Sequence, residues 1–217
     1  MLDLVYAVGR SLPKSVRMKI KNVAIRIGFD TTDWVRVVMY RECFAFIESI
    51  GPEIIDVLEI SGGNSQWRRR FKFGSYTSTD FPDFDICAEA VDRQFDLIIA
   101  DQVFEHLAWP MRAGRNVYAM LRRGGYFVIA TPFLVRVHED PLDCSRWTEQ
   151  GLSYLLQECG FQAPDIKIRS WGNRKCLKAN LFKWRRYGFY RSLANEPNFP
   201  VMVWGIARKP TDTSEGC

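Results

Sequence analysis

Short apolar runs alternate with segments of helical character along this chain. Residues 54–60, 95–101 and 126–131 form three largely apolar runs, which are typical of strands buried on both faces of a parallel sheet. Further strands are predicted at residues 76–79, 165–171 and 201–208, and a short one after the loop at residues 80–87. Helices are predicted at residues 10–26, 34–50, 66–72, 111–122 and 148–159. Strands that alternate with helices in this way predict an α/β fold.

The turn after the first strand is the most informative stretch. Residues 61–65, Ser-Gly-Gly-Asn-Ser, follow Glu59, and small turn residues let the backbone come close to a ligand at the end of a strand. Asp80 follows Glu59 by 21 residues and comes directly after the second predicted strand. An acid at that strand end can bind the two hydroxyl groups of a ribose. The pattern therefore indicates a nucleoside cofactor, and the alternative is an ordinary turn between a strand and a helix.

Composition narrows the class of protein. A length of 217 residues with 47% hydrophobic residues suits one globular domain. No apolar run approaches the roughly 20 residues that span a bilayer, and no signal peptide is expected, so we expect a cytoplasmic protein. The six cysteines include no Cys-x-x-Cys pair, so we interpret them as reduced thiols and predict no metal site.

Positive charge is concentrated in two segments. Residues 10–26 carry six basic residues and residues 167–191 carry nine, and neither segment contains an acid, although the net charge is only +5. The first has the pattern of an amphipathic helix, and the second has aromatic residues between its arginines and lysines. Such segments suit an anionic acceptor, an anionic membrane surface or RNA. Solvated surface is the alternative for both.

Several sequence blocks together resemble the class I S-adenosylmethionine-dependent methyltransferases of the broad type 11 group. The blocks are the turn at 61–65, the acid Asp80, the stretch 95–107 (FDLIIADQVFEHL) and the stretch 121–132 (LRRGGYFVIATP), in the family's order. The resemblance covers about residues 50–165. It implies a Rossmann-like, seven-stranded, mostly parallel sheet with an antiparallel last strand and helices on both faces.

The resemblance also implies the cofactor, S-adenosyl-L-methionine, and the residues that bind it. Residues 59–65 would surround its methionine part, Asp80 its ribose, Asp85 and Ile86 its adenine, and Asp101 with Gln102 its amino group. The cofactor-binding candidates are Glu59, Ser61, Gly62, Gly63, Ser65, Asp80, Asp85, Ile86, Asp101 and Gln102. The chain departs from the family pattern Glu-x-Gly-x-Gly-x-Gly, because Ser61 and Ser65 replace the first and third glycines.

The acceptor side is less specific. Residues 138–152 resemble a block common in methyltransferases near bacterial glycan and lipopolysaccharide genes. His138 is the candidate base, or else a loop residue bonded to Asp140 or Asp143, and Asp101 is the second catalytic candidate. The candidate substrate-binding residues are His106, Arg146, Trp147 and Trp171. For His106 a structural role is favoured, and Arg146 either holds an acidic group of the acceptor or pairs with Asp143.

We therefore expect N-terminal helices over residues 1–50, a methyltransferase domain over 51–208 with an insertion at 172–199, and a tail at 209–217. The expected function is methylation, mainly at oxygen, of a saccharide or other small molecule in glycan or secondary-metabolite biosynthesis, with peripheral membrane contact through the basic segments. The alternatives are a degenerate cofactor-binding scaffold and, less favoured, an RNA methyltransferase. A nicotinamide dehydrogenase is least favoured, because the blocks at 95–107 and 121–132 resemble methyltransferases.

Overall fold

A computed structural model describes residues 32–63, 65–188 and 190–211. The basic helix predicted at residues 10–26 lies outside these ranges. The strands are β1 (Asp56–Ile60), β2 (Ser75–Thr79), β3 (Phe95–Asp101), β4 (Leu121–Pro132), β5 (Ile166–Trp171) and β6 (Met202–Arg208). The α-helices are α3 (Val37–Ser49), α4 (Trp67–Arg70), α5 (Pro110–Met120), α6 (Glu149–Glu158) and α7 (Arg174–Asn180). Short 3-10 turns are η1 (Trp34–Arg36), η2 (Pro52–Ile54), η3 (Phe104–His106) and η4 (Ala163–Asp165).

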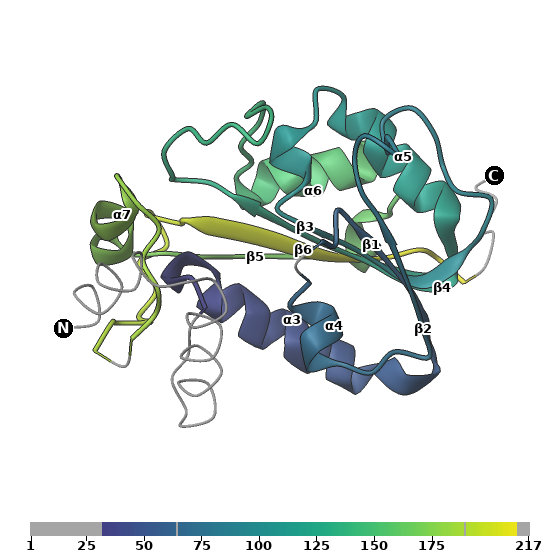
Figure 1. The fold of residues 1–217 in the computed structure, drawn as a ribbon, viewed down its shortest axis with the longest axis horizontal. Helices are drawn as coiled ribbons and strands as arrows, with labels where there is room; N and C mark the ends of the chain where they lie inside the picture. The colour runs from purple at the N-terminus through teal and green to yellow at the C-terminus, as the bar shows by residue number, and fades with distance from the viewer. Residues whose placement is uncertain (1–31, 64, 189, 212–217) are drawn as a thin grey trace, which may run out of the picture.

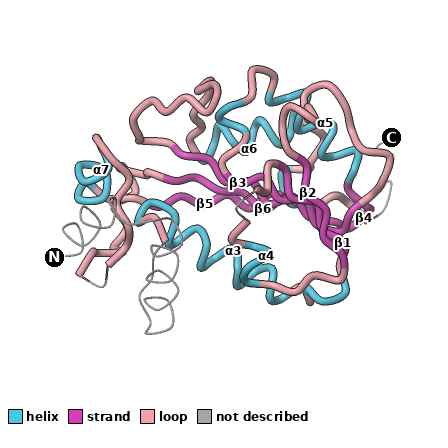
Figure 2. The backbone as a smooth tube through the Cα atoms, viewed as in Figure 1, coloured by secondary structure: helices cyan, strands magenta, loops and turns pink. Residues whose placement is uncertain are grey.

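The six strands form one sheet in the order β2-β1-β3-β4-β6-β5. Strands β2, β1, β3 and β4 are parallel, and β6 lies antiparallel between β4 and β5. Helices α3 and α4 cover one face of the sheet, and α5 and α6 cover the other (Figures 1 and 2). The predicted α/β class and the antiparallel last strand are thus confirmed.

Each face of the sheet has its own apolar core. Ile98 and Phe127 pack with Leu156 of α6 on one face, and Val57 and Leu97 pack with Trp67 of α4 on the other. Alternating residues of each central strand therefore serve opposite cores, which explains why these strands are apolar along nearly their whole length. None of the helices in the described ranges is long and apolar enough to span a membrane.

The short strand predicted after the loop at residues 80–87 is wrong, because residues 80–94 form turns and irregular backbone. The carboxylate of Asp85 accepts a hydrogen bond from the backbone N–H of Cys87, 2.8 Å away, and its carbonyl accepts from Ala88 and Glu89. These bonds close a turn where the family has an edge strand, so the described sheet has six strands rather than seven.

Most other predicted boundaries agree within a few residues. Thr148 caps α6 through its side-chain oxygen, which accepts from the N–H of Gly151, and Gly160 follows the helix with a φ of 113°. Strand β4 begins earlier than predicted, at Leu121. Lys209, expected in the tail, is anchored because its ammonium group donates to the carbonyl oxygens of Tyr118 and Leu121.

An ion-pair network fixes the amino ends of the central strands. The guanidinium of Arg122 contacts Asp56 and Asp96, each at 2.6 Å, and Asp96 also accepts from the backbone N–H of Asp56. The hydrogen bonds from Ser75 and Arg122 lower the pKa of the Asp56 carboxyl. Three strands, β1, β3 and β4, are thereby held in register at the edge opposite their carboxyl ends.

The turn after β1 explains two features of its sequence. Ser61 has a φ of 57°, in the left-handed region that glycine tolerates best, and its N–H donates to the carbonyl of Thr79. A β-carbon added to Gly62 would lie only 2.6 Å from Oγ of Ser78 and 2.8 Å from the hydroxyl of Tyr76. Ser61 thus occupies a glycine-like conformation, and Gly62 is required because there is no room for a side chain.

Replacing Ser61 with glycine is expected to raise the free energy of unfolding by up to about 1 kcal/mol, because the strain of a side chain at positive φ is removed. Ser65→Gly is the matched control. It is expected to lower stability, because Ser65 donates to Glu59 and accepts from the N–H of Arg68. Denaturant titrations of both variants check this, and a destabilised Ser61→Gly protein would contradict the assigned conformation.

Candidate functional site

Polar side chains with incomplete hydrogen bonding gather where the parallel strands end. Thr79 of β2, Asp101 of β3 and Thr131 of β4 each have a buried side-chain oxygen without a hydrogen-bond partner among the described residues. Glu59, near the end of β1, is buried as well. Since buried polar groups are nearly always paired, these unpaired oxygens indicate that a ligand binds at this edge of the sheet.

Glu59 is held under the turn after β1. Its carboxylate accepts from the hydroxyl of Tyr76, at 2.7 Å, and from the hydroxyl of Ser65. Burial raises the pKa of the Glu59 carboxyl to about 7, against these two hydrogen bonds, which lower it. The hydrogen bond between Ser65 and Glu59 therefore stabilises the turn. Ser65, which replaces the third glycine of the family pattern, has a structural role.

Gly63 and Asp80 face each other across the mouth of the turn. A β-carbon added to Gly63 would lie 3.8 Å from Oδ1 of Asp80, and no other side chain in the described ranges comes as near to it. Asp80 is exposed. The arrangement leaves a nucleoside room to approach both the backbone of Gly63 and the carboxylate of Asp80, as the sequence predicts.

Asp101 ends β3 with one oxygen occupied and one unpartnered. Oδ2 accepts from the hydroxyl of Tyr40 on α3, at 2.6 Å, whereas Oδ1 is buried without a partner. Burial, and then the nearby Asp101, raise the pKa of Tyr40, so its hydroxyl stays a proton donor. Arg36 interacts electrostatically with both residues. The free oxygen of Asp101 suits an ammonium group, which fits the role that the family resemblance implies.

Gln102 follows Asp101 with a φ of 60°, and its N–H donates to the carbonyl of Ala130. Its side-chain amide lies 3.2 Å from the sulfur of Met202. The other two predicted cofactor residues have structural roles, because Asp85 closes the turn described above and the Ile86 side chain is buried in the core with α5. An adenine contact at these two positions would have to use the backbone or the second carboxylate oxygen of Asp85.

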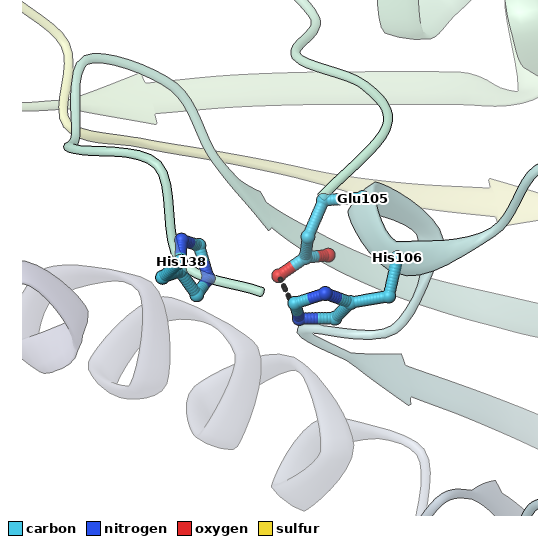
Figure 3. Close-up of side chains that lie close together, drawn as sticks. All are labelled: Glu105, His106 and His138. Atoms are coloured by element: carbon cyan, nitrogen blue, oxygen red, sulfur yellow. Dashed lines mark ion pairs between the residues drawn. The ribbon is translucent and has the colours of Figure 1, made fainter. Parts of the chain in front are cut away.

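His106 and His138 come together with a residue that we did not predict, Glu105 (Figure 3). The rings of His106 and His138 are nearly perpendicular, with centroids 5.2 Å apart. Nε2 of His106 lies 3.6 Å from Oε1 of Glu105, whose carboxylate is fully buried and lacks hydrogen-bond partners among the described residues. Burial raises the pKa of Glu105 to about 8, and burial also lowers the pKa of His138.

Arg146 braces the loop that carries His138. Its guanidinium contacts both carboxylate oxygens of Asp143, and Asp143 accepts from the backbone N–H of His138 at 2.8 Å. The hydrogen bonds from Arg146 lower the pKa of Asp143 to about 2. Of the two predicted roles for Arg146, the structure supports pairing with Asp143. Among the described residues His138 donates no hydrogen bond to Asp140, and Nδ1 of its ring lies 3.7 Å from Oδ2 of Asp143.

The two predicted substrate-binding tryptophans lie in different surroundings. Trp147 is half-buried and packs against the core beneath α6. Trp171 is only 2% exposed, and its indole N–H donates to the carbonyl of Leu193. The prediction for Trp171 is therefore wrong in this structure, since its ring packs inside the protein and its polar atom is already paired.

Trp184, which the sequence analysis did not single out, contacts the acceptor-side loop. Its ring centroid lies 5.5 Å from that of His138, and the guanidinium of Arg136 stacks over it at 4.3 Å. Arg136 also donates to the carbonyl of Asn180, so the insertion after β5 borders the His138 loop. A hollow lined by Ile55, Asp96 and other residues lies instead at the amino ends of the strands.

Sequence and structure comparisons agree with this geometry. A family model described as a methyltransferase domain matches residues 55–129. No protein in the curated set matches the sequence. A similar solved structure is an S-adenosylmethionine-dependent methyltransferase from Mesorhizobium loti, with a TM-score of 0.52 and 14% identity, covering 76% of this chain and 97% of that one.

Two further structures have the same fold. A methyltransferase from Clostridium acetobutylicum has a TM-score of 0.52 and 12% identity, and the match covers 88% of this chain and 98% of that one. Phosphoethanolamine N-methyltransferase 2 of Haemonchus contortus has a TM-score of 0.52 and 13% identity over 79% of this chain, which spans only 53% of that protein. The match of residues 55–129 to a methyltransferase domain and the shared fold of these structures support a class I S-adenosylmethionine-dependent methyltransferase.

Proposed function

We propose that the protein transfers a methyl group from S-adenosylmethionine to an oxygen of a saccharide or other small acceptor. The observation that carries the proposal is the arrangement after β3. Asp101 offers a free oxygen toward the cofactor side, and Glu105 and His106, four and five residues later, join His138 on the acceptor side. Cofactor-binding and acceptor-handling groups are thus adjacent, as a direct transfer requires.

The residues at the strand ends fit the cofactor. Asp80 would bind the ribose hydroxyls, the backbone at Gly63 would approach the methionine part, and Oδ1 of Asp101 would accept from its ammonium group. When bound, S-adenosylmethionine supplies an electrophilic methyl group. The chain's own task is to hold the acceptor's oxygen in line, keep water out and remove the hydroxyl proton.

The acceptor-side residues suit an oxygen acceptor. Nδ1 of His138 lies 3.3 Å from the carbonyl of Arg136 and 3.4 Å from the guanidinium of Arg146. In the tautomer in which Nδ1 donates to that carbonyl, the other ring nitrogen is left to accept. Burial keeps this ring neutral near pH 7, since it lowers the pKa. His138 is therefore proposed to act directly on the acceptor's hydroxyl, and the sugar class follows only from the resemblance of residues 138–152 to glycan methyltransferases.

A cofactor-binding scaffold without activity is the competing function, motivated by Ser61 and Ser65. Against it, Ser61 adopts the φ that the family glycine provides, and Ser65 bonds inward to Glu59 rather than toward the cofactor side. Neither serine therefore blocks the cofactor. Binding of S-adenosylmethionine without turnover on any acceptor of a broad glycan and nucleotide-sugar panel would favour the scaffold.

Asp80→Ala is expected to weaken binding of S-adenosylhomocysteine by about 1–3 kcal/mol, because the ribose hydroxyls lose their acceptor. Isothermal titration calorimetry measures the effect. Asp83→Ala is the control, since Asp83 is an exposed acid in the same loop. Equal affinities of the wild type and a folded Asp80→Ala protein would argue against a nucleoside at this strand end.

His138→Ala is expected to lower turnover by about 10²–10⁴-fold while S-adenosylhomocysteine affinity stays nearly unchanged, because His138 acts on the acceptor and not on the cofactor. Single-turnover kinetics with the acceptor found in the panel measure the chemical step. Glu139→Ala changes the neighbouring exposed residue and serves as the control. Wild-type turnover in His138→Ala would leave His138 a loop residue.

We also propose that the tip after α7 contacts an anionic membrane surface that presents the acceptor. Phe182 is 90% exposed, Leu181 is 45% exposed, and Lys178 and Lys183 next to them are exposed. An apolar tip with flanking lysines suits the interface of an anionic bilayer. Arg186 is not part of this surface argument, because it pairs with Asp33 at 3.1 Å.

Phe182→Ser combined with Lys183→Glu is expected to weaken binding to phosphatidylglycerol vesicles by about tenfold, since an apolar anchor and one favourable charge of about 1 kcal/mol are lost. Vesicle sedimentation at two salt concentrations measures it. The control is Lys72→Glu with Tyr154→Ser, which changes an exposed charge and an exposed ring outside the basic segment. Salt-independent or unchanged binding would assign the tip to ordinary solvated surface.

A further inference from the structure

We propose that Glu105, His106 and His138 form a binding site for a divalent transition-metal ion such as Zn²⁺. Each of the three side chains offers one ligand atom, and these atoms lie within 4.8 Å of one another (Figure 3). No sequence spacing predicts the site, because η3 supplies two ligands and the loop after β4 supplies the third.

The separation of Glu105 and His106 is that of two ligands rather than of a hydrogen-bonded pair. Nε2 of His106 and Oε1 of Glu105 are 3.6 Å apart, beyond the usual hydrogen-bond range. Two ligands bonded at about 2.0–2.1 Å to one tetrahedral ion lie roughly 3.3 Å apart. A small inward movement would therefore place both atoms around one ion.

The Glu105 carboxylate has no hydrogen-bond partner in the described part of the chain, although Arg36 and Arg146 interact with it electrostatically. It is 0% exposed, and neither carboxylate oxygen has a hydrogen bond. Leaving a buried carboxylate unpaired is costly, so such groups are paired or coordinate metals. Glu105 is thus a buried oxygen donor directed at two imidazoles, which a cation would satisfy.

Each histidine has a backbone carbonyl beside Nδ1, which suits ligation through Nε2. Nδ1 of His106 contacts the carbonyl oxygen of Leu142, and Nδ1 of His138 lies 3.3 Å from the carbonyl oxygen of Arg136 and 3.4 Å from the guanidinium of Arg146, so a carbonyl acceptor is in place for each Nδ1–H when Nε2 binds an ion. Metal-bound histidines typically donate one ring N–H to a carbonyl or carboxylate, which fixes the ring and leaves the other nitrogen for the ion. In Figure 3 the rings of His106 and His138 face the Glu105 carboxylate.

Two imidazoles and one carboxylate are ligands that zinc and other first-row divalent ions accept, with further coordination positions open. Mg²⁺ is not favoured, because it prefers oxygen ligands and octahedral geometry. Three protein ligands with an open position are the arrangement of catalytic rather than structural zinc sites. The described cysteine nearest the site, Cys144, points its thiol at the carbonyl of His106 instead.

The role of the ion rests on the proposed function. An acceptor hydroxyl bound at an open position would lose its proton to solvent more readily, because a cation lowers the pKa of a bound oxygen acid. The ion would then replace His138 as the group that activates the acceptor, and His138 would serve as its ligand. Metal binding itself does not depend on methyl transfer and is tested separately.

Titration calorimetry of the full chain, stripped with a chelator, is expected to show one high-affinity Zn²⁺ ion per chain and no comparable binding of Mg²⁺. Glu105→Gln and His138→Asn are each expected to weaken Zn²⁺ binding by about 100-fold or more, and Asp143→Asn by about tenfold through the His138 loop. Cys144→Ser and Glu139→Gln are the controls and are expected to bind like the wild type.

The Co²⁺-loaded protein adds a spectroscopic test. Its absorption spectrum is expected to contain no thiolate charge-transfer band, and its visible bands are expected to disappear in His138→Asn. This variant is less prone to misfold than Glu105→Gln, because His138 is partly exposed. S-adenosylhomocysteine binding reports that each variant is folded. Absent stoichiometric binding, binding that survives the Glu105 and His138 changes, or loss of binding in Cys144→Ser would each overturn the site. If the protein binds the ion but transfers no methyl group, the metal site stands and only the proposed function is refuted.

Discussion

Parallel pairing of four strands is the constraint on which the rest of this protein depends. Ile60 of β1 pairs with Ala100 of β3, and Ala100 pairs in turn with Ile129 of β4, so these strands end at one edge. Beyond that edge the strand backbones no longer form hydrogen bonds with one another. Side-chain oxygens of Asp101 and Thr131 there are buried without a hydrogen-bond partner in the described part of the chain. The ion pairs of Arg122 at the opposite edge hold the same strands in register, so the site depends on a network far from it.

The fold was predictable because its signal is local and repeated. Strand β3 was predicted with its observed ends, and the cap and stop of α6 were read from Thr148 and Gly160. The exception, the short strand predicted after the loop at residues 80–87, shows the limit of such patterns. Asp85 favours a turn because its carboxylate bonds to a backbone N–H two residues on, and two or three apolar residues cannot outweigh that bond.

The site was predictable in part. Gly63 and Asp101 were found because they follow or end apolar runs, and Asp80 because it follows the strand predicted at residues 76–79. Glu105 and Trp184 were missed because their importance comes from burial and from contacts between distant segments, which no spacing encodes. Trp171 was misassigned for the same reason, because an aromatic residue in a basic segment does not reveal which way its ring packs.

The stretch that matches the methyltransferase family, residues 55–129, stops before His138, Arg146 and Trp184. The loop that carries His138 is braced by its own ion pair and by Trp184, and not by the turn at Ser61 or by Asp80. The two halves of the site therefore have separate supports. Mutations can reshape the acceptor side over evolutionary time without loosening the cofactor side, so descendants of one ancestral enzyme can diverge in substrate while their shared domain stays recognisable.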